Sequence, residues 1–136
     1  MVYLTRIEKF NAAHKLWVKT WSDEKNKSMF GKCANKNFHG HNYTLHVTVK
    51  GHLDPATGFV INAKDLSAIV KKEIVEELDH MNLNMDIPEF EGNIQPTCEN
   101  LTLYIWRKLS TNLNNCTLHG IKLYETDSIY TEYYGE

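Results

Sequence analysis

The sequence of 136 residues contains little cysteine and little proline, and it has no excess of positive charge. Only Cys33, Cys98 and Cys116 are present, and an odd number of cysteines cannot form a complete set of intramolecular disulfides. Fifteen Lys and Arg stand against 17 Asp and Glu, which gives a net charge of -2. This balance argues against a broad nucleic-acid surface, although it allows a local basic pocket for a small anion.

Long hydrophobic segments are also missing. No apolar run approaches the roughly 20 residues that cross a bilayer, and residues 1–6 lack the apolar core of a signal peptide. We therefore expect a cytoplasmic protein with reduced thiols and no membrane contact. Apolar residues make up 42% and charged residues 24%, and the length is near that of an average domain. These values predict one globular domain over residues 1–136.

Four segments have the alternation of apolar and polar side chains, or the composition, that is typical of strands. The pattern is clearest where Tyr43, Leu45 and Val47 alternate with polar residues. A polar turn at 126–128 indicates that the last two segments form a hairpin. The strands are expected at 2–13, 41–51, 118–125 and 128–134.

Helical periodicity predicts two helices. The first runs over Asn62–Leu78 with Asn62 as its N-cap, and the second begins at Thr97. Segments 15–38 and 80–96 have no clean period and are predicted as long loops. The order of elements favours an α+β fold, in which a four-stranded antiparallel sheet carries both helices on one face. Its open edges need protection or a partner, so we expect a homo-oligomer built by sheet extension.

The most specific motif is His39-Gly40-His41, because two residues at i and i+2 of an extended segment point to the same side. His14, at the end of the first strand, would lie beside them if the first two strands are neighbours. Three imidazoles suit zinc and leave one coordination position open. The alternative is a pair of exposed histidines on an edge strand, and the spacing alone does not decide between the two.

Other polar residues are ambiguous when taken from the sequence alone. Cys33 lies six residues before His39 and could be a fourth zinc ligand, a nucleophile, a base or an inert buried thiol. The adjacent Asp79 and His80 could exchange protons in a cleft, but a histidine at a helix C-terminus is favoured by the helix dipole alone. The dipole likewise accounts for Glu99 in the first turn of the second helix.

Seven short motifs occur in order across nearly the whole chain. They are 10–16 (FNAAHKL), 30–33 (FGKC), 39–43 (HGHNY), 54–58 (DPATG), 78–84 (LDHMNLN), 96–101 (PTCENL) and 124–127 (YETD). On these motifs the chain resembles the 6-pyruvoyl-tetrahydropterin synthase family, in its animal-type branch. The resemblance implies a tunnelling fold whose sheets join into barrels in a homohexamer, a dimer of trimers with active sites between subunits.

The resemblance also implies a reaction. It is the zinc-dependent conversion of 7,8-dihydroneopterin triphosphate to 6-pyruvoyl-tetrahydropterin with release of triphosphate, in tetrahydrobiopterin biosynthesis. One Zn²⁺ per subunit is expected, and Mg²⁺ could accompany the substrate triphosphate. Expulsion of triphosphate calls for positive charge, for which Lys15, directly after His14, is a candidate.

Matching the motifs residue by residue assigns roles. The implied zinc ligands are His14, His39 and His41. Cys33 would be the base that removes a proton from the substrate side chain, and Asp79 and His80 would be its partner pair in proton transfer. A metal charge nearby favours ionisation of a thiol, which agrees with that assignment.

The implied pterin pocket contains Glu125, which would accept hydrogen bonds from the ring NH and amino group, with Thr97 and Glu99 lining the same pocket. Three residues depart from the family pattern. Lys36 and Phe38 stand where relatives tend to have smaller or turn-forming residues such as Pro and Gly, and Cys98 stands where Ser, Thr or Ala is usual.

Two alternatives remain. The bacterial-type branch makes 6-carboxy-tetrahydropterin for queuosine synthesis, but it usually has three residues between the cysteine and His-Gly-His, whereas five separate Cys33 from His39 here. Asn62 also stands where that branch commonly has Asp. The second alternative is a non-catalytic zinc-binding protein. Retention of the whole implied catalytic set argues against it: Cys33, Asp79, His80 and Glu125.

Overall fold

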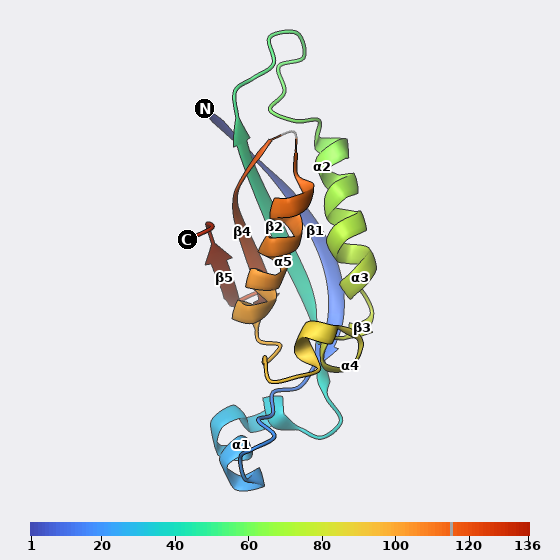
Figure 1. Cartoon of the computed structure of the whole chain (residues 1–136), viewed down its shortest axis with the longest axis vertical. Helices are drawn as coiled ribbons and strands as arrows, with labels where there is room; N and C mark the ends of the chain where they lie inside the picture. Colours follow the sequence, from blue (N-terminus) through green and yellow to red (C-terminus); the bar gives the residue numbers. More distant parts are fainter. Residues whose placement is uncertain (115) are drawn as a thin grey trace.

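A twisted five-stranded sheet forms the centre of the computed structural model, which describes residues 1–114 and 116–136 (Figure 1). The strand order is β3-β1-β2-β4-β5. The strands are β1 (Val2–His14), β2 (His39–Gly51), β3 (Met81–Asn82), β4 (Thr117–Thr126) and β5 (Ile129–Tyr133). The α+β class is confirmed, but the prediction of four antiparallel strands is wrong. The additional strand, β3, pairs parallel with β1 and is too short to produce an alternating pattern.

The long antiparallel pair β1 and β2 sets which side chains point toward the core. Phe10 pairs with Tyr43, and the register continues to the end of β1, where His14 lies opposite His39. Phe10 and Tyr43 are buried and their rings stack with centroids 5.0 Å apart. The histidines at the ends of these strands therefore face the same side as the hydrophobic core.

Both predicted helices pack on one face of the sheet, as expected (Figure 1). The first is continuous through α2 (Ala63–Val70), a π turn (Lys71–Val75) and α3 (Glu76–Leu78), and the second is α5 (Cys98–Asn112). The N-cap of the first helix is Asn62, as predicted, and Thr97, where the second helix was expected to begin, is the N-cap of α5. No helix in the described part of the chain is long and apolar enough to cross a membrane.

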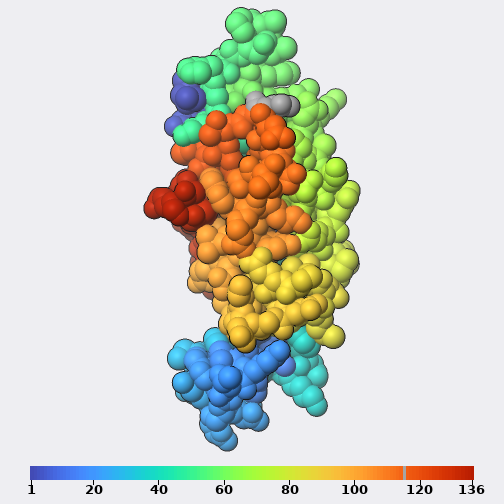
Figure 2. Space-filling view, in the orientation of Figure 1, coloured from blue at the N-terminus to red at the C-terminus, as the bar shows by residue number. Residues whose placement is uncertain are grey.

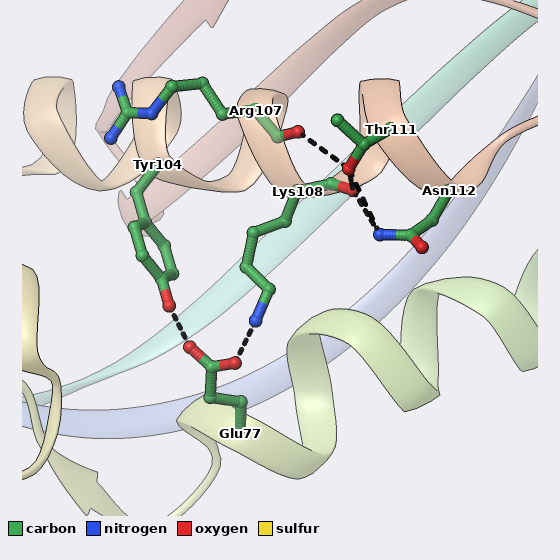
Figure 3. A network of polar contacts seen from close by, with 6 residues as sticks. All are labelled: Glu77, Tyr104, Arg107, Lys108, Thr111 and Asn112. Carbon is green, nitrogen blue, oxygen red and sulfur yellow. Dashed lines mark hydrogen bonds and ion pairs between the residues drawn. The ribbon is translucent and has the colours of Figure 1, made fainter.

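One carboxylate joins the two helices on their outer side (Figure 3). Glu77 at the end of the first helix accepts hydrogen bonds from the Tyr104 hydroxyl and the Lys108 ammonium group on α5. Burial and the Glu77 carboxylate raise the pKa of Tyr104, so the phenol stays protonated and remains a donor. This contact fixes how the two helices lie against each other above the sheet.

The two predicted long loops contain short elements that the sequence pattern did not reveal. Segment 15–38 forms α1 (Asp23–Phe30) and a 3₁₀ turn (Gly31–Ala34), and it projects beyond the end of the sheet as a separate lobe (Figure 2). The α1 helix has almost no apolar face, so its periodicity is weak. Instead it is held by Asn26, whose buried side chain bonds the backbone of Val18 through both its oxygen and its nitrogen.

Segment 80–96 is likewise structured. It comprises β3, the short helix α4 (Leu83–Asp86) and a 3₁₀ turn (Pro88–Phe90). Asn82 caps α4 by accepting a hydrogen bond from the Met85 N–H. The segment packs beneath the start of α5 and brings the backbone of Pro96 against the end of β1.

Candidate active site

Three imidazoles meet at the ends of β1 and β2. The register of the two strands places His14 opposite His39, and His41 lies on the same face two residues further along β2. The His14 ring centroid is 4.5 Å from that of His39 and 5.0 Å from that of His41. One nitrogen from each ring lies within 4.8 Å of the others, so the predicted meeting of these side chains is confirmed.

The protonation state of His14 suits a metal ion. The Nδ1 of His14 lies 2.7 Å from the carbonyl oxygen of Pro96, which can only accept, so Nδ1 carries the proton and donates. Burial, reinforced by His39 and His41, lowers the pKa of His14 to about 4. The lone pair on Nε2 of His14 is therefore free at neutral pH.

Several ring nitrogens in the cluster are buried without a hydrogen-bond partner among the described residues. They are Nε2 of His14, both ring nitrogens of His39 and Nε2 of His41. An unpaired buried polar atom costs about 1–3 kcal/mol, and a shared cation would satisfy several of them at once. Neutral imidazoles are ordinary zinc ligands, so the donor set fits a zinc ion. The alternative of exposed histidines on an edge strand is wrong, because β1 and β2 are interior strands.

Cys33 is outside this group of converging ligand atoms. Within residues 1–114 and 116–136, the group consists of the three histidines alone, which gives no support to Cys33 as a fourth ligand. The cysteine is half-buried in the 3₁₀ turn after α1, so it is not an inert core thiol. Its carbonyl oxygen accepts a 2.8 Å hydrogen bond from the Leu16 N–H, which ties the turn to the chain two residues beyond His14.

Glu125, near the end of β4, lies beside the cluster. Its Oε1 is 3.6 Å from Nε2 of His41, and both side chains are largely buried. Burial raises the pKa of the Glu125 carboxyl, the adjacent His41 opposes the rise, and the charge of Glu99 adds to it. Glu99 itself is exposed in the first turn of α5, and the Thr97 hydroxyl is engaged in capping that helix by accepting from the Asn100 N–H.

Asp79 and His80 form an oriented pair at the other edge of β1. The Asp79 carboxylate accepts from the Asn11 N–H at 2.9 Å and lies 2.8 Å from the Nδ1 of His80. The Asn11 contact, followed by His80, lowers the pKa of Asp79, so the carboxylate stays ionised. The His80 side chain is 76% exposed and lines a cavity of about 490 Å³ to which His41 also contributes. The structure thus shows an oriented imidazole at the wall of a cavity, which is compatible with the predicted proton-transfer pair.

Residues 3–136 match the family model described as 6-pyruvoyl tetrahydropterin synthase. The chain belongs to this family. It is 47% identical over 127 residues to the human 6-pyruvoyl tetrahydrobiopterin synthase, covering 93% of this chain and 87% of the human protein. It superposes on the structure of the Caenorhabditis elegans 6-pyruvoyl tetrahydropterin synthase with a TM-score of 0.91 and 34% identity, covering 99% and 96% of the two chains. It is also 30% identical to the Haemophilus influenzae 6-carboxy-5,6,7,8-tetrahydropterin synthase, over 76% of this chain and 84% of that protein.

Two residues of this 6-pyruvoyl tetrahydropterin synthase family member support the site and were not found from the sequence. The Pro96 carbonyl orients His14 from 82 positions away, and no local pattern signals such a contact. Asn11 binds the Asp79–His80 pair through both its backbone N–H and its carbonyl oxygen. Because backbone atoms make these contacts, the residue type carries no sequence signal.

Proposed function

We propose that the protein converts 7,8-dihydroneopterin triphosphate to 6-pyruvoyl-tetrahydropterin and releases inorganic triphosphate, as a carbon–oxygen lyase of tetrahydrobiopterin biosynthesis. The observation that carries this proposal is the cluster of three converging imidazoles at the ends of β1 and β2, with Glu125 beside it. Membership of the family and the names of the close animal relatives supply the substrate class.

His14, His39 and His41 would hold one Zn²⁺ per subunit. When bound, zinc acts as a Lewis acid toward the hydroxyl oxygens of the substrate side chain. The Pro96 carbonyl supports this arrangement, because it holds His14 in the tautomer whose Nε2 is available. Mg²⁺ accompanying the triphosphate is part of the same proposal.

Cys33 is the proposed base, and Asp79 with His80 is the proposed partner pair. Cys33, as the thiolate, would take a proton from a side-chain carbon. The electron pair left behind would form a carbon–carbon double bond in the rearranging side chain, and the carbon–oxygen bond to triphosphate would break with its electron pair passing to the bridging oxygen. Asp79 holds the Nδ1–H of His80, which leaves Nε2 of that ring free to give or take a proton. No external oxidant is needed, because the redox change is internal.

Glu125 is the proposed anchor of the pterin ring. An ionised carboxylate can accept hydrogen bonds from both the ring NH and the exocyclic amino group, so an analogue that lacks these donors would leave a buried charge unpaired. Glu99 and Thr97 are proposed to line the same pocket from the start of α5. The position of Glu99 supports this role, because Glu99 lies close enough to affect the pKa of Glu125.

We further propose a homohexamer, formed as a dimer of trimers in which open sheet edges pair into barrels. The strand β5 is an open edge of the sheet, and Ile129 and Tyr130 on it are about half exposed. The exposed His80 at the opposite edge would face a neighbouring subunit in such an assembly. The three free cysteines agree with a reducing cytoplasmic location.

A product assay tests the reaction directly. Incubation with 7,8-dihydroneopterin triphosphate should give 6-pyruvoyl-tetrahydropterin by mass, together with free triphosphate. The alternative is the 6-carboxy-tetrahydropterin reaction, because the Haemophilus influenzae relative bears that name. Detection of 6-carboxy-tetrahydropterin and acetaldehyde would replace our assignment with that one.

The Cys33→Ala variant tests the proposed base. Triphosphate release should fall by about 100-fold or more while the zinc content stays the same, since general base catalysis contributes about 10² to 10⁴ in rate. Cys98→Ser is the matched control, because Cys98 is buried and burial raises its pKa to about 11. Loss of zinc from Cys33→Ala would make Cys33 a metal ligand instead of a base.

A further inference from the structure

Positive charge is concentrated in one lobe of the molecule, although the chain as a whole is slightly acidic. Segment 15–38, the lobe that projects beyond the sheet, contains six lysines and two acidic residues (Figure 2). The rest of the chain has nine basic and 15 acidic residues. The lysines of the lobe are Lys15, Lys19, Lys25, Lys27, Lys32 and Lys36. An anion approaching the molecule is therefore attracted to this lobe.

Three of these lysines line one cavity of about 370 Å³, and its walls include Trp17, Asp23, Ala34 and Asn35. The lysines are Lys15, Lys27 and Lys36. None of the ion pairs found in the described part of the chain involves any of the three. A cavity lined by three lysines outside these ion pairs and by one aspartate has a net positive charge, and its volume is sufficient for a small-molecule ligand.

The ammonium group of Lys15 is held in place by aromatic rings. Its Nζ lies 5.2 Å from the ring centroid of Phe38 and 5.5 Å from that of Trp17. Phe38 adopts a positive φ of 66°, which is uncommon for a bulky residue. Cation–π contacts position the charge without neutralising it, so Lys15 remains able to bind an anion.

Two residues that line the cavity are neighbours of candidate active-site residues along the chain. Lys15 directly follows His14, Ala34 directly follows Cys33, and the Leu16 N–H bonds the Cys33 carbonyl oxygen at 2.8 Å. Glu125, by contrast, lies beside His41. The proposed pterin anchor, Glu125, is thus next to His41, whereas the lysine cavity is lined by the residue that follows His14.

We propose that the cavity formed by Lys15, Lys27 and Lys36 binds the triphosphate arm of the substrate and receives triphosphate as it departs. This inference rests on the proposed function for the identity of the anion. When the bond between the side-chain carbon and the bridging oxygen breaks, its electron pair passes to that oxygen. Ammonium groups placed there beforehand stabilise the growing negative charge and form charge-assisted hydrogen bonds with phosphate oxygens.

Calorimetry with inorganic triphosphate tests the cavity without any turnover. The double variant Lys15→Met/Lys36→Ala should bind triphosphate more weakly than the unchanged protein by about 100-fold or more, since two hydrogen bonds to charged groups are lost. Methionine keeps the length of the Lys15 stem against the two rings. The charge-matched control is Lys64→Ala/Lys72→Ala, which removes two exposed lysines of the first helix and should leave the affinity unchanged.

Two results would overturn the inference: equal affinity in the cavity variant, or an equal loss in the control variant. Steady-state kinetics distinguishes failure of this inference from failure of the proposed function. The cavity variant should raise KM for dihydroneopterin triphosphate by a similar factor, while inhibition by dihydroneopterin, which has no phosphate, stays the same. If the unchanged protein releases no triphosphate from that substrate, the proposed function fails, and the calorimetric comparison still decides whether the cavity binds triphosphate.

Discussion

The hydrogen bond from His14 to the Pro96 carbonyl oxygen decides which nitrogen of that ring faces the other two imidazoles. Neutral histidine has two tautomers, and only the one protonated at Nδ1 can make this bond. The unprotonated Nε2 is buried and has no other partner among the described residues. A single backbone carbonyl therefore prepares a side chain 82 positions away for a metal.

Replacing His39 tests the metal site at the scale of one residue. His39→Ala should weaken zinc binding by about 100-fold or more, because loss of an orienting group alone costs about 10-fold to 100-fold and His39 would be a direct ligand. Elemental analysis after gel filtration in zinc-free buffer measures the zinc remaining per chain. His52→Ala is the control, since His52 is exposed and outside the cluster. An unchanged zinc content in His39→Ala would refute the proposed ligand set.

The structure also shows the surroundings of Cys98, one of the residues that depart from the family pattern. The Cys98 thiol is buried at the start of α5 and contacts the Leu123 carbonyl oxygen and the Thr131 hydroxyl, each at 3.4 Å. Burial raises its pKa to about 11, so it remains a thiol at neutral pH. Cys98 is thus a packing residue, and Cys33, in the half-buried turn, is the more accessible of the two.

At the scale of secondary structure elements, a buried carboxylate joins β1 to the first helix. Glu8 on β1 is 8% exposed and accepts hydrogen bonds from the Ser67 hydroxyl of α2 at 2.5 Å and from Arg6 Nε at 2.9 Å. Burial raises the pKa of Glu8, but Ser67, Arg6 and the charge of Lys71 together bring it below the usual value of 4.5. The folded state therefore favours the ionised carboxylate.

This pKa shift has a definite consequence for stability. A carboxyl whose pKa is lower in the folded state contributes stability above its unfolded pKa and loses it as the pH falls through the folded pKa. Glu8→Gln should lower the free energy of unfolding by about 1–3 kcal/mol at pH 7, and the difference from the unchanged protein should shrink below pH 4.5. Urea denaturation at several pH values measures both effects.

Comparing the two proteins at each pH cancels the titration of groups that they share. Glu76→Gln provides a control for loss of a negative charge, because Glu76 is exposed on the first helix, which packs against β1. A difference between Glu8→Gln and the unchanged protein that stays constant down to pH 3 would contradict the proposed linkage.

Sequence patterns revealed the elements with a strong period and missed those held by side-chain contacts. The β2 strand and the two long helices alternate or repeat over enough residues to be recognised. The N-cap Asn62 was also found, and the start of the second helix was placed at Thr97, which is its N-cap. The α1 helix has no apolar stripe, and the Asn26 side chain stabilises it by bonding Val18. Such a contact cannot be read from hydrophobic periodicity.

At the scale of the whole molecule, the open edges of the sheet support the proposed assembly. The outer strand β5 carries Ile129 and Tyr130 about half exposed, which leaves both unpaired backbone groups and apolar surface at one edge. A neighbouring subunit that adds its own strand would satisfy the backbone groups and cover that surface.

Sedimentation velocity measures the assembly. The unchanged protein should sediment with six times the 15.8 kDa mass of one chain, and Ile129→Lys should shift it to smaller species by placing a charge in the strand contact. Ile94→Lys is the control, because Ile94 is exposed to a similar extent but lies outside the sheet. A monomer at micromolar concentration in the unchanged protein would rule out the proposed hexamer.

The sequence by itself determined the family, the α+β class and the identity of the three histidines that meet. The i, i+2 spacing put His39 and His41 on one side of an extended segment, and the resemblance carried by the short motifs added His14 as the third member of the set. Only the tertiary structure decided that Pro96 orients His14, that Asn11 holds the Asp79–His80 pair and that lysines of the projecting lobe share one cavity. These contacts join segments distant in the chain, often through backbone atoms, so no residue pattern encodes them until the chain has folded.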